Sequence, residues 1–398
     1  MAESKKVPEL RFKGFTDDWE QSRLSELSTI ITGTTPSTAD KTNYSGNKLF
    51  VSPADIQGNR FISETTTTLS DKAFHLSRVL NPGTLLFVSI GSSLGKVAQL
   101  ADYATTNQQI NAVIPDKSID ANFTFSLLEK MASQIKKQSA IQTMPIINKT
   151  AFGNSITVFP KSQEQIRLGA FFLNIDNFIA LHAQKHDKLL ALKKSMLGKM
   201  FPKAGWNVPE VRFAGFTGDW ERRKFGDVFE EYSEKNHADL PPLTIIQGGG
   251  TVRRDESDRS LQYDKASLSN YKLVNEGDFI VHLRSFEGGL EAATTTGIIS
   301  PAYHTFHGDN TDSRFYYSFF RSKSFIEVAL KPHVYGIRDG RSIDIEGMKT
   351  IEIPYTAPAE QRVIGEYIEK LDSLIALHQR KCEALKQLKK SLLEKMFV

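Results

Sequence analysis

The chain has 398 residues, of which 40% are hydrophobic and 24% charged, proportions typical of a folded protein rather than a disordered one. Its formal net charge of +4 permits a nucleic-acid partner without requiring one. No run of about 18 apolar residues occurs and the first ten residues lack an apolar signal core, so we expect a cytoplasmic protein with no membrane contact. A single cysteine, Cys382, excludes an internal disulfide.

The first element along the chain is a short phrase, VPELRFKGFTDDWE, at residues 7–20. It returns as VPEVRFAGFTGDWE at 208–221, with eleven of fourteen letters kept. We call these two stretches the lead phrases. Each carries a tryptophan near its end, Trp19 and Trp220, and we expect both to pack where a globular body meets a helix.

The first body, about residues 22–160, alternates strand-like runs such as GTLLFVSI and INAVIP with turn signals and one helical piece, NFTFSLLEKMASQI. This mixture predicts an α+β domain. One turn, TTNQQIN, gathers amide side chains, which can bind adenine bidentately in the major groove. The candidate base readers in this body are Asn107, Gln108, Gln109 and Asn111.

A long charged segment follows at 164–201, and it returns at 360–397 with eighteen of thirty-eight positions identical. Neither stretch contains proline, and each predicts a helix about 55 Å long. Apolar residues recur at steps of three and four, as in a coiled coil. The helix-pairing candidates are Leu168, Phe171, Ile175, Phe178, Leu189, Leu192, Ile364, Leu371, Leu374, Leu385 and Leu388.

A helix of this length cannot bury its apolar stripe alone, so we expect the two copies to pair with each other. Equivalent halves related by a twofold axis would pair antiparallel. His182 and His378 then meet at the midpoint, followed one turn later by His186 and Cys382. Four such side chains could bind a metal, but polar core positions that set the register are the favoured interpretation, and we predict no zinc site.

The second body, about residues 223–356, also predicts an α+β domain, with strands such as GDFIVHL and a helical piece, SRFYYSFFRSKSFIEVAL. Its turns RSFEGG and HVYGIRDGRS offer arginine, the side chain that most often contacts guanine. The base-reading candidates here are Arg284, Tyr335, Arg338 and Arg341. For phosphate contacts across both bodies the candidates are Arg60, Lys96, Arg253, Arg254 and Lys331.

Catalytic motifs are weak in both bodies. GSSLGKV at 91–97 has the wrong spacing for a phosphate-binding loop, and DLPPL at 239–243 lacks the aromatic residue of an amino-methyltransferase motif. We therefore expect no catalytic residues and no metal. The predicted organisation is a body with its lead phrase at 1–160, a spacer helix at 161–207, a second body with its lead phrase at 208–356 and a second spacer helix at 357–398.

The duplicated lead phrase, the two differing bodies and the repeated EQ…LIALH…LKKSLLEKMF helix resemble the DNA-specificity (S) subunit of type I restriction-modification systems over the whole chain. The resemblance implies two α+β target recognition domains separated by two long antiparallel coiled-coil helices, with a pseudo-twofold internal repeat. It implies a non-catalytic subunit that binds a bipartite, asymmetric sequence in double-stranded DNA and docks two methyltransferase subunits. S-adenosylmethionine, ATP and Mg are then expected in the methyltransferase and restriction (motor-nuclease) subunits, and no cofactor in this chain.

Two alternatives stay open from the sequence. A coiled-coil scaffold with two protein-binding heads would not bind DNA. A methyltransferase or nuclease acting alone would bind its own cofactor, which the missing motifs disfavour. The lead-phrase tryptophans could also contact a methyltransferase subunit, although packing is the favoured role.

Overall fold

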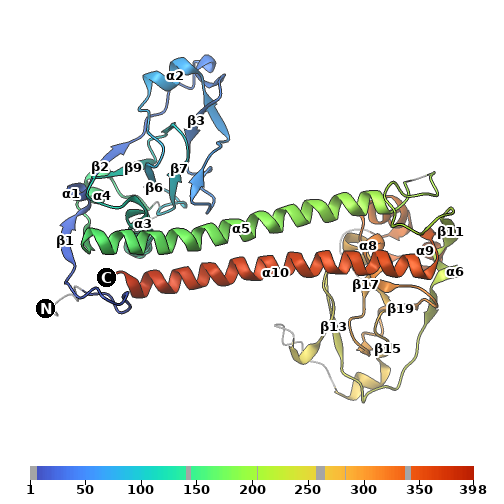
Figure 1. The fold of residues 1–398 in the computed structure, drawn as a ribbon. Helices are drawn as coiled ribbons and strands as arrows, with labels where there is room; N and C mark the ends of the chain where they lie inside the picture. The colour runs from blue at the N-terminus through green and yellow to red at the C-terminus, as the bar shows by residue number, and fades with distance from the viewer. Residues whose placement is uncertain (1–6, 140–144, 204, 257–264, 283, 337–341) are drawn as a thin grey trace. The chain divides into compact units, whose positions relative to one another are not determined.

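The computed structural model describes residues 7–139, 145–203, 205–256, 265–282, 284–336 and 342–398. The chain divides into two compact units, Met1–Gln184 with His378–Val398, and Lys185–Leu377. Unit 1 is the first of these and unit 2 the second. Two long helices, α5 (Ser162–Met200) and α10 (Pro358–Met396), each contribute one half to each unit (Figure 1). The helices predicted over 164–201 and 360–397 are confirmed, and so is the α+β class.

The head of unit 1 is built on a five-stranded sheet of order β2-β9-β6-β7-β4. Strands β6 and β9 lie near its centre, and all four residues of β6 are buried. A three-stranded sheet, β5-β3-β8, and a two-stranded pair, β1-β10, complete the head. The strands are β1 (Glu20–Arg23), β2 (Ser28–Thr32), β3 (Lys48–Val51), β4 (Phe61–Ile62), β5 (Thr67–Leu69), β6 (Leu85–Val88), β7 (Val97–Leu100), β8 (Ala104–Thr106), β9 (Ile110–Pro115) and β10 (Ile156–Phe159). The helices are α1 (Leu24–Leu27), α2 (Asp71–Leu76), α3 (Ala121–Ser139) and α4 (Lys149–Gly153).

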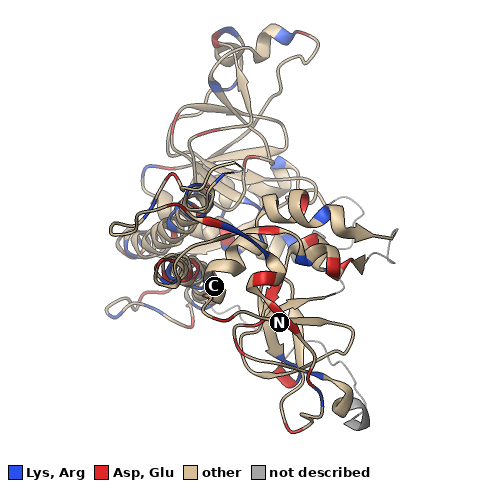
Figure 2. Cartoon of the chain, turned by 90° about the vertical axis from the view of Figure 1, so that its right-hand side faces the viewer, with Lys and Arg blue, Asp and Glu red and all other residues tan. Residues whose placement is uncertain are grey.

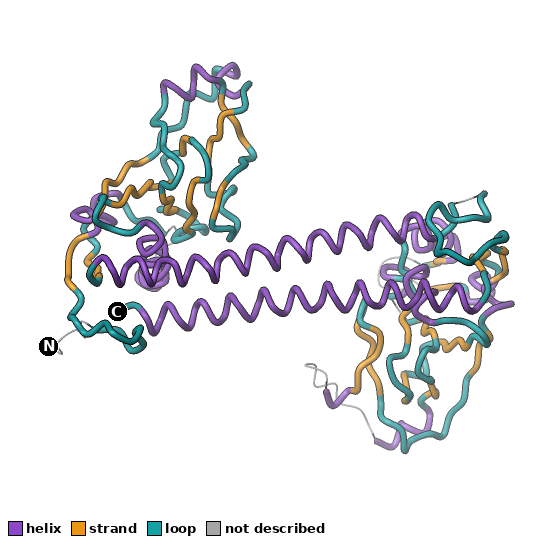
Figure 3. The backbone as a smooth tube through the Cα atoms, in the orientation of Figure 1, coloured by secondary structure: helices purple, strands orange, loops and turns teal. Residues whose placement is uncertain are grey.

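The head of unit 2 has a different sheet, of order β12-β19-β16-β17, with four two-stranded pairs, β11-β22, β13-β14, β15-β18 and β20-β21. Its loops take up much of the head (Figure 3). The strands are β11 (Glu221–Lys224), β12 (Glu230–Tyr232), β13 (Leu243–Ile246), β14 (Gly250–Arg253), β15 (Lys272–Val274), β16 (Phe279–Val281), β17 (Glu291–Ala292), β18 (Gly297–Ile299), β19 (His304–His307), β20 (Val334–Tyr335), β21 (Ser342–Ile343) and β22 (Glu352–Tyr355). The helices are α6 (Phe225–Val228), α7 (Ser285–Gly288), α8 (Ser313–Phe320) and α9 (Ile345–Lys349).

The lead phrases act as clips that join two helices within each unit. In unit 1 the Arg11 guanidinium forms two hydrogen bonds of 2.7 Å with Glu164, at the start of α5, and Leu10 N donates to Lys395 O near the end of α10. In unit 2 Arg212 binds Glu360, at the start of α10, at 2.6 and 2.8 Å. Val211 N likewise donates to Lys199 O near the end of α5. The phrase is duplicated because the same clip is built in both units.

The tryptophan of each clip packs on the aromatic end of a helix. Trp19 is 2% exposed and lies edge-on to Phe397, with ring centroids 6.1 Å apart. Trp220 is equally buried and lies edge-on to Phe201, also at 6.1 Å. The repeated KMF sequence at the end of the long helices therefore packs against the hydrophobic core of each unit. Both tryptophans have a packing role.

The glutamine of the EQ pair, near the start of each long helix, forms hydrogen bonds that connect the helix to the head of its unit. Gln165 donates to Pro160 O at 2.8 Å and accepts from Asp120 N at 3.1 Å. Gln361 repeats both contacts, with Thr356 O at 2.7 Å and Asp312 N at 3.1 Å. Asp120 and Asp312 in turn accept hydrogen bonds from the first turns of α3 and α8. The frame of each unit is thus set by side-chain hydrogen bonds as well as by apolar packing.

A glycine four residues after each of these glutamines, Gly169 or Gly365, lets the capping aspartate approach the long helix. A Cβ at Gly169 would lie 2.3 Å from Asp120 Oδ1 and 2.7 Å from Phe123 N. At Gly198, further along α5, a Cβ would meet nothing within 4 Å. We predict that Gly169→Ala destabilises unit 1 by at least 1 kcal/mol, whereas Gly198→Ala stabilises the helix by about 0.5–1 kcal/mol. Denaturant unfolding of both variants measures the contrast, and equal signs would contradict it.

The residues of α5 and α10 that face inward are not all the ones that the heptad pattern predicts. Leu168 and Ile175 are buried, as are Ile364 and Leu371, while Phe171, Leu189, Leu374 and Leu385 are half-buried. Phe178, Leu192 and Leu388, however, are 52, 37 and 50% exposed, so the prediction was wrong for these three. Phe172, Ile179, Lys193 and Lys389 take the inward positions instead.

Lysines can occupy an inward stripe because their ammonium groups reach a partner carboxylate. Lys193 Nζ lies 2.5 Å from Asp372 in unit 2, and Lys389 Nζ lies 2.5 Å from Asp176 in unit 1. These two pairs occupy equivalent positions of the repeat, and in each unit they join segments of α5 and α10 that run antiparallel. Both ion pairs thus support the orientation in which Lys193 and Lys389 face inward.

The midpoint histidines meet within unit 1. His182 Nδ1 and His378 Nδ1 lie 2.8 Å apart, and Cys382 Sγ contacts Ile179 O at 3.9 Å. His186 instead bonds Asp187. In the described part of the chain, no three His, Cys, Asp or Glu side chains gather as a metal site. No helix among the described residues is both long and apolar enough to cross a bilayer.

Candidate nucleic-acid interface

The amide-rich turn of unit 1 connects β8 to β9. Asn107 Oδ1 accepts from Gln109 N at 3.0 Å, and Asn107 Nδ2 donates to Gln109 Oε1 at 3.1 Å. These bonds form an Asx-type turn, in which an amide side chain replaces a backbone contact. Asn107 and Gln109 are half-buried and shape the turn, whereas Gln108 at its tip is exposed.

Gln108 is held from one side by the loop that follows β2. Thr35 Oγ1 donates to Gln108 Oε1 at 2.5 Å, and Thr34 N donates to Thr106 O at 2.9 Å. Gly33 makes this approach possible, because a Cβ there would lie 2.2 Å from Asn107 O. Within the described residues the Gln108 Nε2 group has no hydrogen-bond partner. The turn therefore presents one braced amide whose Nε2 donors are free and whose Oε1 keeps a second lone pair, so that it can still bind adenine bidentately.

Two predicted contacts in unit 1 do not fit the structure. Asn111 is 2% exposed and bonds Thr32 Oγ1 at 2.8 Å and Ser89 Oγ at 2.7 Å, so it holds strands together and cannot reach a base. Arg60 is 7% exposed, stacks 4.1 Å from the Phe125 ring and pairs with Asp176 at 3.2 Å. Burial lowers the pKa of Arg60, opposed by Asp176.

These corrections share one cause. A strand residue and a loop residue look alike in the sequence until the strand pairing is known, and Asn111 belongs to β9. Arg60 sits next to β4, and its side chain turns inward to Asp176 on α5, 116 residues away.

In unit 2 the hairpin β13-β14 carries an exposed tip at residues 246–249. The tip is fixed from beneath by Glu291, which is fully buried. Its carboxylate accepts from Gly248 N at 2.7 Å, Gly250 N at 3.1 Å and Tyr317 Oη at 2.8 Å, and it pairs with Arg321. Sequence reasoning missed Glu291, although an acidic residue within an apolar strand run was a visible signal.

Arg284 adjoins α7, the short helix whose last residue contacts this tip. It precedes α7 and is exposed. The tip residue Gln247 packs on Gly288 at the end of α7, where a Cβ would lie 2.3 Å from Gln247 Nε2. Tyr335 is 59% exposed on β20. Arg338 and Arg341 lie outside the described residues.

The remaining phosphate candidates are at or near the surface. Lys96 is half-buried at the start of β7. Arg253 pairs with Asp255 at 2.9 Å and Lys331 with Glu327 at 3.1 Å, both in exposed pairs that contribute little to stability and can exchange for phosphate. Arg254 donates to Leu243 O and Tyr271 Oη. Acidic and basic residues are interspersed over the ribbon (Figure 2).

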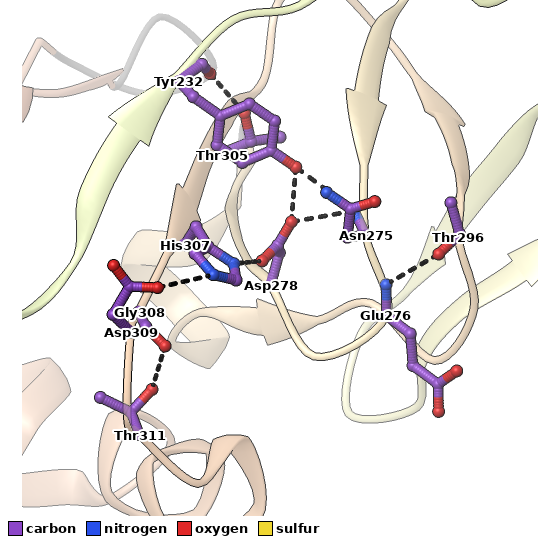
Figure 4. Close-up of polar contacts among 10 residues, drawn as sticks. All are labelled: Tyr232, Asn275, Glu276, Asp278, Thr296, Thr305, His307, Gly308, Asp309 and Thr311. Atoms are coloured by element: carbon purple, nitrogen blue, oxygen red, sulfur yellow. Dashed lines mark hydrogen bonds and ion pairs between the residues drawn. The ribbon is translucent and has the colours of Figure 1, made fainter.

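A second buried acid, Asp278, organises the start of β16 in unit 2 (Figure 4). Its carboxylate accepts from Tyr232 Oη at 2.5 Å, from Asn275 N at 2.9 Å and from His307 Nδ1 at 2.6 Å. Burial, followed by the bond to Asp278, raises the pKa of Tyr232. The bond to Asp278 likewise raises the pKa of His307, whose side chain is half-exposed.

This raised pKa predicts a pH-dependent contribution to stability. Because the folded-state pKa of His307 lies above its ordinary value, the stabilisation is complete below about pH 6.5 and is lost as pH rises through the folded-state value. We expect His307→Asn to be less stable than the parent chain by a larger margin at pH 6 than at pH 8.5. Thermal unfolding at both pH values measures this, and a constant margin would refute the ion pair.

Residues 16–191 match the family model described as "Type I restriction modification DNA specificity domain". The chain is 21% identical over 396 residues to the specificity subunit of the type I restriction enzyme MjaVIII of Methanocaldococcus jannaschii, covering 95% of this chain and 91% of that protein. These matches support a type I restriction-modification specificity subunit.

Other relatives agree with this assignment. The specificity subunit of the HindI enzyme of Haemophilus influenzae is 31% identical over 151 residues, which are 37% of this chain and 33% of that protein. The fold matches the S subunit of a type I system from M. genitalium with a TM-score of 0.65 and 12% identity, over 98% of this chain and 99% of that one. The fold of this chain therefore matches that of a solved type I S subunit along almost the whole of both chains.

Proposed function

We propose that this chain is the non-catalytic subunit that reads a bipartite, asymmetric sequence in double-stranded DNA, one half with each head. The observation that supports this most is the contrast between frame and head. Both units use the same Arg–Glu clip and the same glutamine–aspartate contacts, yet they carry different sheets and different exposed loops. One frame with two heads suits a target made of two different half-sites.

Linking two weak readers raises their combined affinity through effective concentration. We propose that α5 and α10 set the spacer between the half-sites. As in the expectation from sequence, S-adenosylmethionine, ATP and Mg would bind to partner subunits and not to this chain. A DNA-reading subunit acts where the DNA is, so we keep the cytoplasm as the proposed compartment.

Salt dependence separates this function from a coiled-coil scaffold. The full chain should bind duplex DNA, with an affinity that falls steeply between about 50 and 200 mM salt as counterions are released. A scaffold with protein-binding heads would show no such affinity. Binding of S-adenosylmethionine by the isolated chain would instead favour an enzyme acting alone.

Docking of two methyltransferase subunits is the second part of the proposal. Because Phe178 and Leu388 do not face inward, the helices expose an apolar face in unit 1. Both side chains are about half exposed there, beside a hollow of about 390 Å³. The repeat places Leu374 and Leu192 at the equivalent positions in unit 2, and Leu192 is 37% exposed. An apolar face that occurs once in each unit suits a partner present in two copies.

We predict that Phe178→Ser with Leu388→Ser removes one methyltransferase subunit per chain, because it deletes two apolar side chains from one face only. Adding Leu192→Ser and Leu374→Ser should remove the second. Mass measurement of the purified complex gives the stoichiometry, and Leu76→Ser, at a 79% exposed residue of the unit 1 head, is the control. Retention of both subunits in the fourfold variant would overturn the docking proposal.

A further inference from the structure

A groove of about 700 Å³ lies in unit 1 between the loop at 56–60, the start of β7, helix α3 and the helices α5 and α10. Six basic and two acidic side chains line it, a formal excess of four positive charges. The basic residues are Arg60, Lys96, Lys136, Lys386, Lys389 and Lys390, and the acidic ones Glu129 and Asp176. We call this the lysine groove.

The charges at the floor of the lysine groove compensate one another. Lys389 Nζ lies 2.5 Å from both Glu129 and Asp176, and Arg60 lies 3.2 Å from Asp176. Lys389, Arg60 and Asp176 have side chains less than 10% exposed. These four groups form a closed network of two cations and two anions. The positive excess therefore belongs to the rim.

The rim consists of four lysines, Lys96, Lys136, Lys386 and Lys390. Among the described residues none of their four ammonium groups has an ion-pair or hydrogen-bond partner. Lys136 packs along Gly95, where a Cβ would lie 3.0 Å from its Cε, and so its stem is directed to the same turn that carries Lys96. Four unpaired ammonium groups around one hollow favour an occupant with several negative charges.

The rim is only partly shared between the two copies of the repeat. The floor pair Asp176–Lys389 has an exact equivalent in Asp372–Lys193 of unit 2. Of the two rim lysines on α10, Lys390 corresponds to Lys194, but Lys386 corresponds to Leu190. A role shared by both units, such as holding the helices together, would not need this extra charge. The rim belongs with the features that distinguish the unit 1 head.

The position of the rim relative to Gln108 indicates what binds there. Val88 N donates to Lys96 O, and the next residue, Ser89, donates through N to Gln109 O, so Lys96 and the amide turn flank the same end of β6. In the order β9-β6-β7 they are two strand spacings, or about 10 Å, apart. The DNA major groove is about 12 Å wide. When the Gln108 side chain contacts a base in the major groove, the sugar–phosphate backbone at the edge of that groove therefore lies within reach of Lys96.

We propose that the lysine groove binds the sugar–phosphate backbone of the duplex whose bases Gln108 contacts, adjacent to the half-site of unit 1. This inference rests on the proposed function and adds a phosphate anchor to it. Lysine ammonium groups on flexible stems bind phosphate as point charges without sequence preference. The anchor strengthens binding and sets the register of unit 1, while the choice of base stays with the turn.

The test compares two triple variants of the full chain in complex with the methyltransferase subunit encoded beside it. One is Lys136→Gln, Lys386→Gln, Lys390→Gln. The control, Lys188→Gln, Lys194→Gln, Lys370→Gln, removes the same charge from exposed helical positions outside the groove. Binding to a random-sequence duplex of about 30 base pairs is measured at several salt concentrations. Each lost phosphate contact lowers the slope of log affinity against log salt by about 0.9.

We expect the groove variant to lower the slope by about 2 to 3 and the control to leave it unchanged within about 0.5. Equal slopes in both variants would overturn the anchor, provided that the parent complex binds DNA. A parent complex without DNA affinity would overturn the proposed function, and the anchor with it. Both variants should melt at the parent temperature, because the lysines changed lie outside the floor network.

Two further measurements test for other ligands of the lysine groove. Titration with inorganic pyrophosphate tests for a free phosphate compound: stabilisation of the parent chain but not of the groove variant, together with unchanged DNA slopes, would overturn the DNA backbone as the occupant. Loss of the methyltransferase subunit from the groove variant alone, again with an unchanged slope, would replace the duplex by an acidic protein segment.

Discussion

Glu360→Ala should destabilise unit 2 by about 3–5 kcal/mol, the cost of leaving one member of a buried ion pair without its partner. The Glu360 side chain is 1% exposed and that of Arg212 15%. Glu360 also accepts from Trp220 Nε1 at 3.1 Å and from Thr356 Oγ1. Its removal therefore takes a carboxylate acceptor away from three residues, Arg212, Trp220 and Thr356.

Hydrogen exchange measures this effect within one unit. Protection in β22 and α8 of unit 2 should fall sharply in Glu360→Ala, and Glu164→Ala should do the same to β10 and α3 of unit 1. Glu366→Ala is the matched control, because Glu366 lies on the same helix in an exposed pair with Arg314 at 3.7 Å and should cost less than about 1 kcal/mol. A loss in Glu360→Ala no larger than in this control would show that the clip does not hold the unit together.

Gln108→Ala should relax the DNA preference of one half-site and leave the other intact. A bidentate amide–adenine contact accounts for about 1–3 kcal/mol of discrimination, so we expect a roughly five- to hundredfold loss at one base pair. Arg284→Ala should relax the other half-site. The two variants serve as controls for each other, because each retains the reader that the other has lost.

Thr35→Val refines the same experiment. It removes the hydroxyl that braces Gln108 but keeps the amide, so we expect a smaller loss at the same base pair. Maps of methylated adenines made with each variant measure the degeneracy of both half-sites. Relaxation of both halves by Gln108→Ala, or of neither, would contradict the assignment of Gln108 as a reader.

The repeated frame of this protein, made of the lead phrases and the long helices, is largely predictable from sequence because each part occurs twice in the chain. The lead phrases and the EQ helices can be aligned by eye, and the length and pairing of the helices follow from periodicity. The contacts themselves were not predictable. Nothing in the sequence connects Arg11 with Glu164 or Gln165 with Asp120, since these pairs are far apart in the chain and become visible only when the fold brings them together.

The heads were less predictable, for two physical reasons. Exposed and buried polar residues look alike, as Gln108 and Asn111 illustrate in a single turn-and-strand run. The groups that shape the loops, Glu291 and Asp278, are acids in the interior, where a charge is tolerated only with several donors around it. Those donors come from glycine backbone, tyrosine and arginine or histidine of distant strands and helices, and no spacing rule describes them.

We propose that one repeated frame presents two different DNA-reading heads to one split DNA target. The most direct test is a genome-wide map of methylated adenines in cells that express this chain with the methyltransferase subunit encoded beside it. We predict two dissimilar half-sites separated by a fixed gap, with methylation lost when this chain is omitted. Methylation at a continuous motif, or methylation that does not depend on this chain although the complex forms, would contradict it.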